Sequence, residues 1–280
     1  MNEEHATGGR DVAPLFRRYL RAYLRVAPYA VALHRALEAA HISQTPLGRP
    51  LLDLGCGFGE FGSIFFEEPV EAGIDLSRGD LRKAREKGVY RLLAQADARR
   101  LPFHDGSFAS VLSVSTLEHV PRVDLALAEA FRVLRPGGAF VFTVPTDRLS
   151  RMLVVPRALA KLGLAPLGAA YVRRLNTSLG HVNLWDAREW TGTVEQAGFD
   201  VDVSRMIISA RSTAVWDIGL GPALFERFWR LVTGRRLVKP RPLVRLLEAA
   251  LARFGEAEDS SGSNLLVVAR KPHRERDAGE

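Results

Sequence analysis

Cysteine is almost absent from this chain of 280 residues. The one cysteine, Cys56, cannot form a disulfide within the chain, which favours a reducing compartment. No apolar run reaches the roughly 18–20 uncharged residues that a membrane-spanning helix needs. Residues 1–11 are polar and carry acids, unlike a secretory signal, and are expected to form a tail. We therefore expect a cytoplasmic protein without a membrane span.

Metal-site spacing and internal repeats are also missing. No group of Cys, His and carboxylate residues has the spacing of a metal site, so the sequence predicts no metal. Acidic residues are outnumbered, since 39 Lys and Arg stand against 32 Asp and Glu, for a formal net charge of +7. This balance suits nucleic acid, an acidic membrane surface or a charged small molecule, and equally a solvated surface with no partner.

A predicted strand, a glycine-rich turn and a helix follow one another within residues 50–67. Leu51, Leu52 and Leu54 form a short apolar run typical of a buried parallel strand. The glycines of the turn are Gly55, Gly57 and Gly59. They permit positive φ and a close approach of a ligand to the backbone, while the helix N-terminus offers free N–H groups. The stretch is therefore either a nucleotide-type cradle or a plain tight turn.

Acidic residues follow the next two predicted strands. Strand 70–75 ends at Asp75, which lies 20 positions after Gly55, the spacing at which an acid meets ribose hydroxyls. Asp97 comes just after strand 90–95, at the sheet edge where open α/β folds bind ligands, or it belongs to an Asx turn. Further strands at 109–115 and 139–144, with helices at 78–87 and 123–134, predict a doubly wound, mostly parallel α/β sheet.

Several motifs in this order resemble those of the class I S-adenosylmethionine-dependent methyltransferases, in particular the methyltransferase domain 11-like enzymes that act on small molecules and lipids. The matching segments are Leu-Asp-Leu-Gly-Cys-Gly-Phe-Gly (52–59), Gly-Ile-Asp-Leu-Ser (73–77), Ala-Asp-Ala (96–98), Leu-Pro-Phe (101–103), Asp-Gly-Ser-Phe (105–108), Leu-Glu-His-Val (117–120) and Arg-Val-Leu-Arg-Pro-Gly-Gly (132–138). The resemblance implies a Rossmann-like, seven-stranded fold with an antiparallel last strand at 264–270, and S-adenosyl-L-methionine as cofactor. Ala109 departs from the acid that relatives often carry there, with no expected effect on the cofactor.

The resemblance also implies roles for individual residues. Asp53 and the turn would lie by the methionine moiety, Asp75 by the ribose, and Leu76 on the adenine, while Ser115 would line the floor near the methyl donor. Asp97 and Ala98 would meet the adenine edge. The implied cofactor-binding residues are Asp53, Gly55, Cys56, Gly57, Gly59, Asp75, Leu76, Asp97, Ala98 and Ser115.

A dehydrogenase is the competing nucleotide-binding interpretation. Gly57, Gly59 and Gly62 satisfy its G-x-G-x-x-G pattern. Asp53, however, lies in the strand just before the turn, where its carboxylate would repel a pyrophosphate but attract an ammonium group. This charge favours the methyltransferase.

Two helical insertions interrupt the core. The expected division is an N-terminal tail and a helix covering the site (1–45), the cofactor-binding core (46–147), a helical insertion (148–180), the core continuation (181–210), a basic helical lid (211–262), the last strand (263–272) and a tail (273–280). Both insertions are apolar and basic, which suits a lid packed on the core or an interfacial helix on anionic lipid. They indicate a small, largely apolar or lipid-like acceptor, with possible peripheral contact with an anionic membrane.

Two histidines are the candidate catalytic bases if the acceptor must lose a proton. His119 follows the fourth strand and His181 ends the first insertion; either can also be structural. Glu118 and Tyr171 are weaker candidates. Two alternatives stay open: an RNA methyltransferase that uses the basic surface, and a non-catalytic partner subunit with the same fold. Neither an RNA-binding module nor an Asn/Asp-Pro-Pro-Tyr motif is present, and the set of Asp53, Asp75 and Asp97 argues against a dead site.

Overall fold

The computed structural model describes residues 12–233, 240–255 and 261–273, and their side chains except for those of residues 222–233. The predicted N-terminal tail, residues 1–11, lies outside the described residues, as do Arg235 and Arg236 of the predicted basic lid. Within the described residues, no helix is both long enough and apolar enough to cross a membrane.

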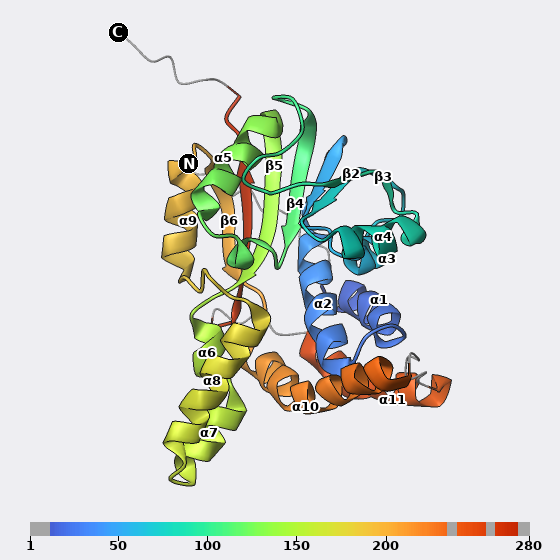
Figure 1. Ribbon diagram of the computed structural model, residues 1–280, viewed down its shortest axis with the longest axis vertical. Helices are drawn as coiled ribbons and strands as arrows, with labels where there is room; N and C mark the ends of the chain where they lie inside the picture. Colours follow the sequence, from blue (N-terminus) through green and yellow to red (C-terminus); the bar gives the residue numbers. More distant parts are fainter. Residues whose placement is uncertain (1–11, 234–239, 256–260, 274–280) are drawn as a thin grey trace, which may run out of the picture.

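A seven-stranded sheet forms the centre of the molecule, in the order β3-β2-β1-β4-β5-β7-β6 (Figure 1). The strands are β1 (Leu51–Leu54), β2 (Val70–Asp75), β3 (Tyr90–Gln95), β4 (Phe108–Val114), β5 (Leu134–Pro145), β6 (Asp200–Met206) and β7 (Asn264–Arg270). All neighbouring pairs are parallel except those of β7, which runs antiparallel to both β5 and β6. The predicted sheet and its antiparallel last strand are confirmed.

The strand order reverses beside β1, since β2 lies on one side of it and β4 on the other. Chain segments leaving these neighbours turn to opposite faces of the sheet, and a crevice opens at their carboxyl ends. The glycine-rich turn after β1 lies in this crevice, so the topology itself places a ligand site there.

Helices cover both faces of the sheet. Helices α5 (Val123–Val133) and α9 (Ala187–Gln196) pack on one face, where Phe140, Phe142 and Trp190 are fully buried. The other face is covered by α1 (Val12–Leu24), α2 (Tyr29–Ile42) and α3 (Glu60–Phe65), with α4 (Arg78–Lys87) beside β2 and β3. Side chains of one core alternate with those of the other along each central strand, as a sheet buried on both faces requires.

The N-terminal segment forms two helices where the sequence predicts one. Pro28 lacks a backbone N–H and precedes the first residue of α2, so the helix cannot run through it. Phe16, Leu20 and Tyr23 of α1 are almost completely buried, and α1 packs closely on α2. The pair is thus part of the core.

The two insertions lie at one end of the molecule. The first contains α6 (Arg148–Met152), α7 (Val154–Lys161) and α8 (Ala165–Leu179), which extend away from the sheet at the bottom of Figure 1. The second contains α10 (Ala210–Thr233), which packs on α2, and α11 (Arg241–Leu251), which packs on α1. Two short 3-10 turns, Leu117–His119 and Ala252–Gly255, complete the described elements.

Candidate cofactor and acceptor site

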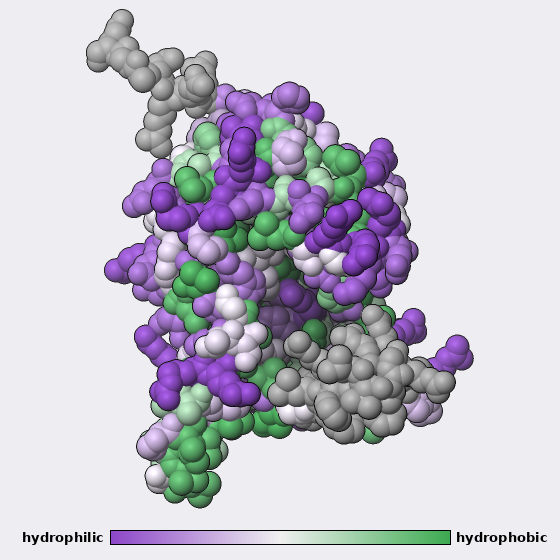
Figure 2. All heavy atoms as spheres, viewed as in Figure 1, coloured by the Kyte–Doolittle hydropathy of each residue, from purple (hydrophilic) through white to green (hydrophobic). Residues whose placement is uncertain are grey.

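A cavity of about 460 Å³ lies at the carboxyl ends of β1, β2 and β4. Figure 2 shows the surface hollowed between the body of the sheet and the lower helices. Nearly all the predicted cofactor-binding residues line this cavity, namely Asp53, Gly55, Cys56, Gly57, Asp75, Leu76, Asp97, Ala98 and Ser115. Gly59 does not; a Cβ there would lie 3.1 Å from Ala84 of α4, so this residue sits at a helix–helix contact.

The turn after β1 needs glycine for two different reasons. Gly55 has φ +83°, and a Cβ there would lie 2.2 Å from the Thr116 side chain, so any larger residue would displace the segment after β4. Gly57 has φ +53°, but a Cβ there would meet no atom within 4 Å. The open side of Gly57 therefore leaves backbone accessible to a ligand in the cavity.

Asp75 is held in place by the backbone. Its two carboxylate oxygens accept hydrogen bonds from Gly57 N at 2.9 Å and from Ser77 N at 2.8 Å. Each oxygen keeps further lone-pair capacity, so the carboxylate can also accept bonds from a vicinal diol. This carboxylate ties the glycine turn to the end of β2 and faces the cavity that a ribose would fill.

The far end of the cavity combines an acid with exposed apolar side chains. Leu76 is 65% exposed and Phe58 is 37% exposed, and both line the cavity. Asp97 accepts bonds from the backbone N and the guanidinium of Arg99, which hold the pKa of its carboxyl below the usual range. Apolar faces beside a polar edge are what a planar base such as adenine requires.

Asp53 is almost completely buried at the end of β1. Burial raises the pKa of Asp53 to about 7, against the bond that its Oδ2 accepts from the Tyr90 hydroxyl at 2.6 Å. A nearby ammonium group would favour its charged form. Cys56 is buried beside it, and burial raises the pKa of this thiol, so Cys56 is a wall residue rather than a nucleophile.

Helix α2 contributes residues that sequence reasoning missed. Val31 and Arg35 line the cavity, as does Tyr23 of α1, although no motif marks them. The fully buried carboxylate of Glu38 accepts bonds from Arg35 at 2.8 Å, Ser115 at 2.7 Å and Thr143 at 2.8 Å. Burial alone would raise the pKa of Glu38, but Arg35, His34 and these hydrogen bonds outweigh it and lower it. Glu38 therefore links α2 to Ser115, directly after β4, and to Thr143 of β5.

A second cavity of about 250 Å³ adjoins the first. Val31, Arg35, Ser115 and His119 line both cavities and so mark the border between them. The apolar part of its wall consists of Pro145, Leu149, Leu179, Trp216 and Leu220. The polar part consists of His34, Glu118, His181 and Asn264. The lining of the first cavity agrees with the predicted cofactor residues, and the second cavity adjoins it. We name them the cofactor cavity and the acceptor cavity, after the roles proposed for them below.

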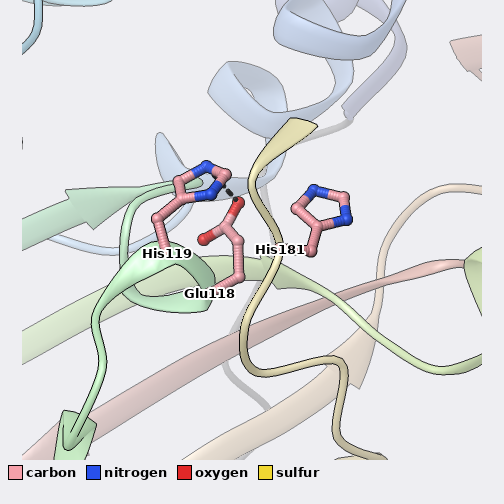
Figure 3. A group of neighbouring side chains, drawn as sticks. All are labelled: Glu118, His119 and His181. Atoms are coloured by element: carbon pink, nitrogen blue, oxygen red, sulfur yellow. Dashed lines mark ion pairs between the residues drawn. The ribbon is translucent and has the colours of Figure 1, made fainter. Parts of the chain in front are cut away.

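Both predicted bases reach this second cavity, and their rings stack with centroids 5.5 Å apart. Figure 3 shows His119 beside Glu118, with His181 close by on the segment after α8. His119 Nδ1 lies 3.0 Å from the Gly180 carbonyl oxygen, and its Nε2 lies 3.6 Å from Glu118 Oε1. Burial, with His119 adding to it, lowers the pKa of His181 to about 4, whereas burial raises the pKa of Glu118 to about 8.

These three residues also offer ligand atoms that all lie within 4.8 Å of one another. Sequence spacing could not reveal such a set, because the fold joins His181 to residues far away in the chain. The cationic Arg35 lines the same cavity and opposes a further cation. The absence of a metal stays a prediction.

Tyr171 was a weaker candidate, and the structure places it outside the lining of both cavities. Its hydroxyl donates a short hydrogen bond to Asp217. Asp217 also accepts bonds from the backbone N–H groups of Val154 and Val155, at 2.7 and 2.8 Å. Tyr171 of α8 therefore helps to hold α8 against α10, and Asp217 also links α10 to the start of α7.

Comparisons with known proteins agree with this geometry. Residues 52–142 match a family described as a methyltransferase domain. The chain is 31% identical over 214 residues to malonyl-[acyl-carrier protein] O-methyltransferase of Geobacter sulfurreducens, an alignment that covers 74% of this chain and 78% of the relative. It is 34% identical over 134 residues to fatty-acid O-methyltransferase of Mycolicibacterium smegmatis, covering 46% of this chain and about half, 47%, of that relative.

A solved structure shares the fold. It is an S-adenosylmethionine-dependent methyltransferase of Thermotoga maritima, described as a possible histamine N-methyltransferase. It superposes with a TM-score of 0.56 at 18% identity and covers 93% of this chain and 99% of its own. With the glycine turn, the acids at the carboxyl ends of β1, β2 and β3, and these relatives, the chain belongs to the class I S-adenosylmethionine-dependent methyltransferases.

Proposed function

We propose that this methyltransferase acts on a small, largely apolar or lipid-like acceptor. The observation that carries the proposal is the second cavity, whose walls include Leu149, Leu179, Trp216 and Leu220. It shares Ser115 and His119 with the cofactor cavity, so a molecule bound there would have its reactive end at the border. An apolar wall with a few convergent polar groups is typical of a small-molecule site.

The names of the relatives support the same class of acceptor. One is a fatty-acid O-methyltransferase and the other a malonyl-[acyl-carrier protein] O-methyltransferase. Both names specify an oxygen acceptor, and one specifies a lipid. From these names we propose that the acceptor of this chain is also lipid-like and that the methyl group is transferred to one of its oxygen atoms.

S-adenosylmethionine supplies a methyl group on a positively charged sulfur. Asp75 and the glycine turn would hold its ribose and methionine parts, and the Asp53 carboxylate its ammonium group. Ser115 lies at the border with φ +48°, a conformation that its hydrogen bond to Glu38 secures. Because methyl transfer is an in-line displacement, orienting both reactants in a closed, largely apolar space supplies most of the catalysis.

His119 and His181 would contact the acceptor. Both line the second cavity, and His119 alone of the two also lines the first. The low pKa keeps His181 neutral at pH 7, so it can accept or donate a hydrogen bond without adding charge. A base at this place would serve an acceptor hydroxyl, which must lose its proton.

The first experiment is calorimetric titration of the full chain with S-adenosylhomocysteine, with NAD as control. Transfer of labelled methyl groups is then measured with fatty acids, long-chain alcohols, quinols and tRNA. We expect S-adenosylhomocysteine alone to bind and an apolar acceptor to be labelled. Labelling of tRNA alone would instead assign the basic surface to RNA.

We also propose a peripheral contact with an anionic membrane, through the α7–α8 hairpin. Its tip exposes Leu162, Leu164 and Leu167, with Leu162 74% exposed, and forms the apolar projection at the lower left of Figure 2. Exposed basic residues flank this tip on both helices, namely Arg157, Lys161, Arg173 and Arg174. Apolar residues that can enter a lipid surface, beside cations that pair with headgroups, are the features of an interfacial anchor.

A further inference from the structure

The border between the two cavities carries one cation, Arg35. Its Nη1 donates to Glu38 at 2.8 Å, and among the described residues its remaining N–H groups have no hydrogen-bond partner. The side chain is 31% exposed although protein surrounds it, because it faces cavity space. A guanidinium presents its N–H groups as a planar fork, which matches the two oxygens of a carboxylate.

Two further buried polar atoms of the second cavity have no hydrogen-bond partner within the described part of the chain. They are His181 Nδ1 and Glu118 Oε2, and the Glu118 side chain as a whole is 1% exposed. Leaving a buried polar atom unpaired is costly, so such atoms commonly mark the place of a ligand. Together with Arg35 they are polar members of a lining that also includes the apolar Leu149, Leu179 and Trp216.

The charge at this end favours an anion over a cation. Glu38 gives both its oxygens to internal bonds, whereas Arg35 keeps N–H donors that have no partner among the described residues and face the cavity. An added divalent cation would lie near the Arg35 guanidinium, whereas an anion would pair with it. The anion would also lie next to the cofactor cavity, where the sulfonium carries a positive charge.

We propose that the acceptor is an apolar carboxylic acid, whose carboxylate binds Arg35 at the border while its hydrocarbon part fills the space between Leu149, Leu179 and Trp216. This inference rests on the proposed function and names its acceptor. The neutral His181 can donate to the same carboxylate through one ring N–H, and since burial raises the pKa of Glu118 to about 8, the protonated carboxyl of Glu118 can donate as well.

The chemistry of a carboxylate acceptor balances without a base. One carboxylate oxygen attacks the methyl carbon, the new O–C bond forms as the S–C bond breaks, and the electron pair of that bond stays on sulfur. The products are a methyl ester and S-adenosylhomocysteine. Because a carboxylic acid is already ionised near neutral pH, no proton has to leave, which agrees with a neutral, weakly basic His181.

The test uses the full chain saturated with S-adenosylhomocysteine. Calorimetric titration with decanoate is compared with titrations with decanol and methyl decanoate, which have the same hydrocarbon chain but no carboxylate. We expect decanoate to bind at least about tenfold more tightly than the other two. Equal affinity for all three, or no binding of decanoate to a protein that methylates another apolar acceptor, overturns the inference and leaves the proposed function intact.

Substitutions of Arg35 test whether the carboxylate of the bound acid contacts this residue. Arg35→Lys keeps the charge beside Glu38 but loses the planar fork, and Arg35→Gln loses both; Arg18→Gln is the matched surface control, because Arg18 is 53% exposed. We expect decanoate affinity to fall about fivefold or more in Arg35→Lys and further in Arg35→Gln, with S-adenosylhomocysteine affinity changed less than about threefold.

One outcome assigns Arg35 differently. If both Arg35 variants lose S-adenosylhomocysteine affinity and keep decanoate affinity, Arg35 serves the carboxylate of the cofactor and the inference is wrong. Failure of wild-type protein to bind S-adenosylhomocysteine at all would contradict the cofactor assignment instead, so the two failures are distinct.

Discussion

Single residues of the site divide into those that hold the backbone and those that face a ligand. Asp75 does both, because its oxygens bind two backbone N–H groups and also line the cofactor cavity. Gly55 only shapes the turn, since a side chain there would collide with Thr116. Substitutions at such residues therefore separate cofactor affinity from stability.

Asp75→Ala should weaken S-adenosylhomocysteine binding about tenfold or more. The change removes the charged hydrogen-bond acceptor that would face the ribose and releases the N–H groups of Gly57 and Ser77, and bonds to charged groups contribute about 1.5–3 kcal/mol each. Calorimetric titration measures the affinity, with the exposed Asp124→Ala as control. Unchanged affinity would remove Asp75 from the ribose site.

His181→Ala should lower turnover about tenfold or more while leaving S-adenosylhomocysteine affinity unchanged. The residue lines the acceptor cavity and is absent from the lining of the cofactor cavity. Steady-state rates and calorimetry on the same preparation check both halves, and the exposed His104→Ala is the matched control. Wild-type turnover in His181→Ala would show that this imidazole has no part in the reaction.

Asp53 should make stability depend on pH. Burial raises its pKa to about 7 from the ordinary value of 3.8, so between these values the folded chain holds a proton that the unfolded chain has released. The stability contributed by this group is therefore full below about pH 4 and is lost as pH rises through about 7.

Asparagine has no carboxyl group that ionises, so the stability of Asp53→Asn does not depend on this titration. The difference between the Tm of Asp53→Asn and the Tm of the wild type should therefore increase by at least about 2 °C from pH 5 to pH 8. In chains of 150–250 residues, 1 kcal/mol shifts Tm by about 2–4 °C. Asp124→Asn is the control, because Arg122 holds the pKa of Asp124 below its usual range and no titration falls in this window. A constant difference between Asp53→Asn and wild type would contradict the raised pKa.

Among the elements, α2 couples the N-terminal helices to the catalytic edge of the sheet. Glu38 receives bonds from α2 itself, through Arg35, and from the ends of β4 and β5, through Ser115 and Thr143. The same helix supplies Val31 and Arg35 to both cavities. Site geometry and helix packing therefore depend on one buried carboxylate.

Glu38→Ala should destabilise the fold by about 3–5 kcal/mol, because it leaves the Arg35 charge unpaired and two hydroxyl donors without an acceptor. Urea or thermal unfolding measures the change. Glu67→Ala is the control, since this residue is 76% exposed in its pair with Arg18 and such pairs contribute about 0–1 kcal/mol. Equal effects of the two changes would show that the buried network is dispensable.

At the scale of the whole molecule, the proposed membrane contact concentrates on one projection. The α7–α8 hairpin carries the exposed Leu162, and α7 has no fully buried residue. Leu149 of α6 and Leu179 of α8, which belong to the same insertion as the hairpin, line the second cavity, so a lipid-like acceptor would reach that cavity beside the proposed membrane contact.

The full chain should sediment with vesicles of phosphatidylglycerol and phosphatidylcholine but not with phosphatidylcholine alone. Leu162→Asp should reduce sedimentation about tenfold by placing a charge at the tip, and added salt should weaken it as headgroup attraction is screened. Leu125→Asp is the matched control, an exposed leucine on α5, 42% exposed and far from the hairpin. Equal sedimentation of both variants would assign the contact elsewhere.

Much of the cofactor half could be predicted from the sequence, because its residues lie within one or two positions of strand ends. The strands at 70–75, 90–95 and 264–270 agree with the structure residue for residue. The fifth strand is longer than predicted, Leu134–Pro145 instead of 139–144, since pairing with its neighbours extends it beyond its apolar run. Gly59 lies outside the cavity lining, at a contact with α4, and its part in cofactor binding stays a prediction, because glycine spacing does not distinguish a ligand contact from a helix contact.

The acceptor half could not be predicted in the same way. Local periodicity and motif spacing report on neighbours in the chain, and by themselves determined the sheet, the glycine turn and the acids at its edge. Only the tertiary structure brought Arg35 of α2, Glu118 after β4, His181 after α8 and Trp216 of α10 around one cavity. The physical reason is that their proximity depends on how α2 packs on the sheet, how α10 packs on α2 and where the first insertion returns to the core. Apolar packing between elements is non-directional, so no fixed spacing of residues in the sequence records it.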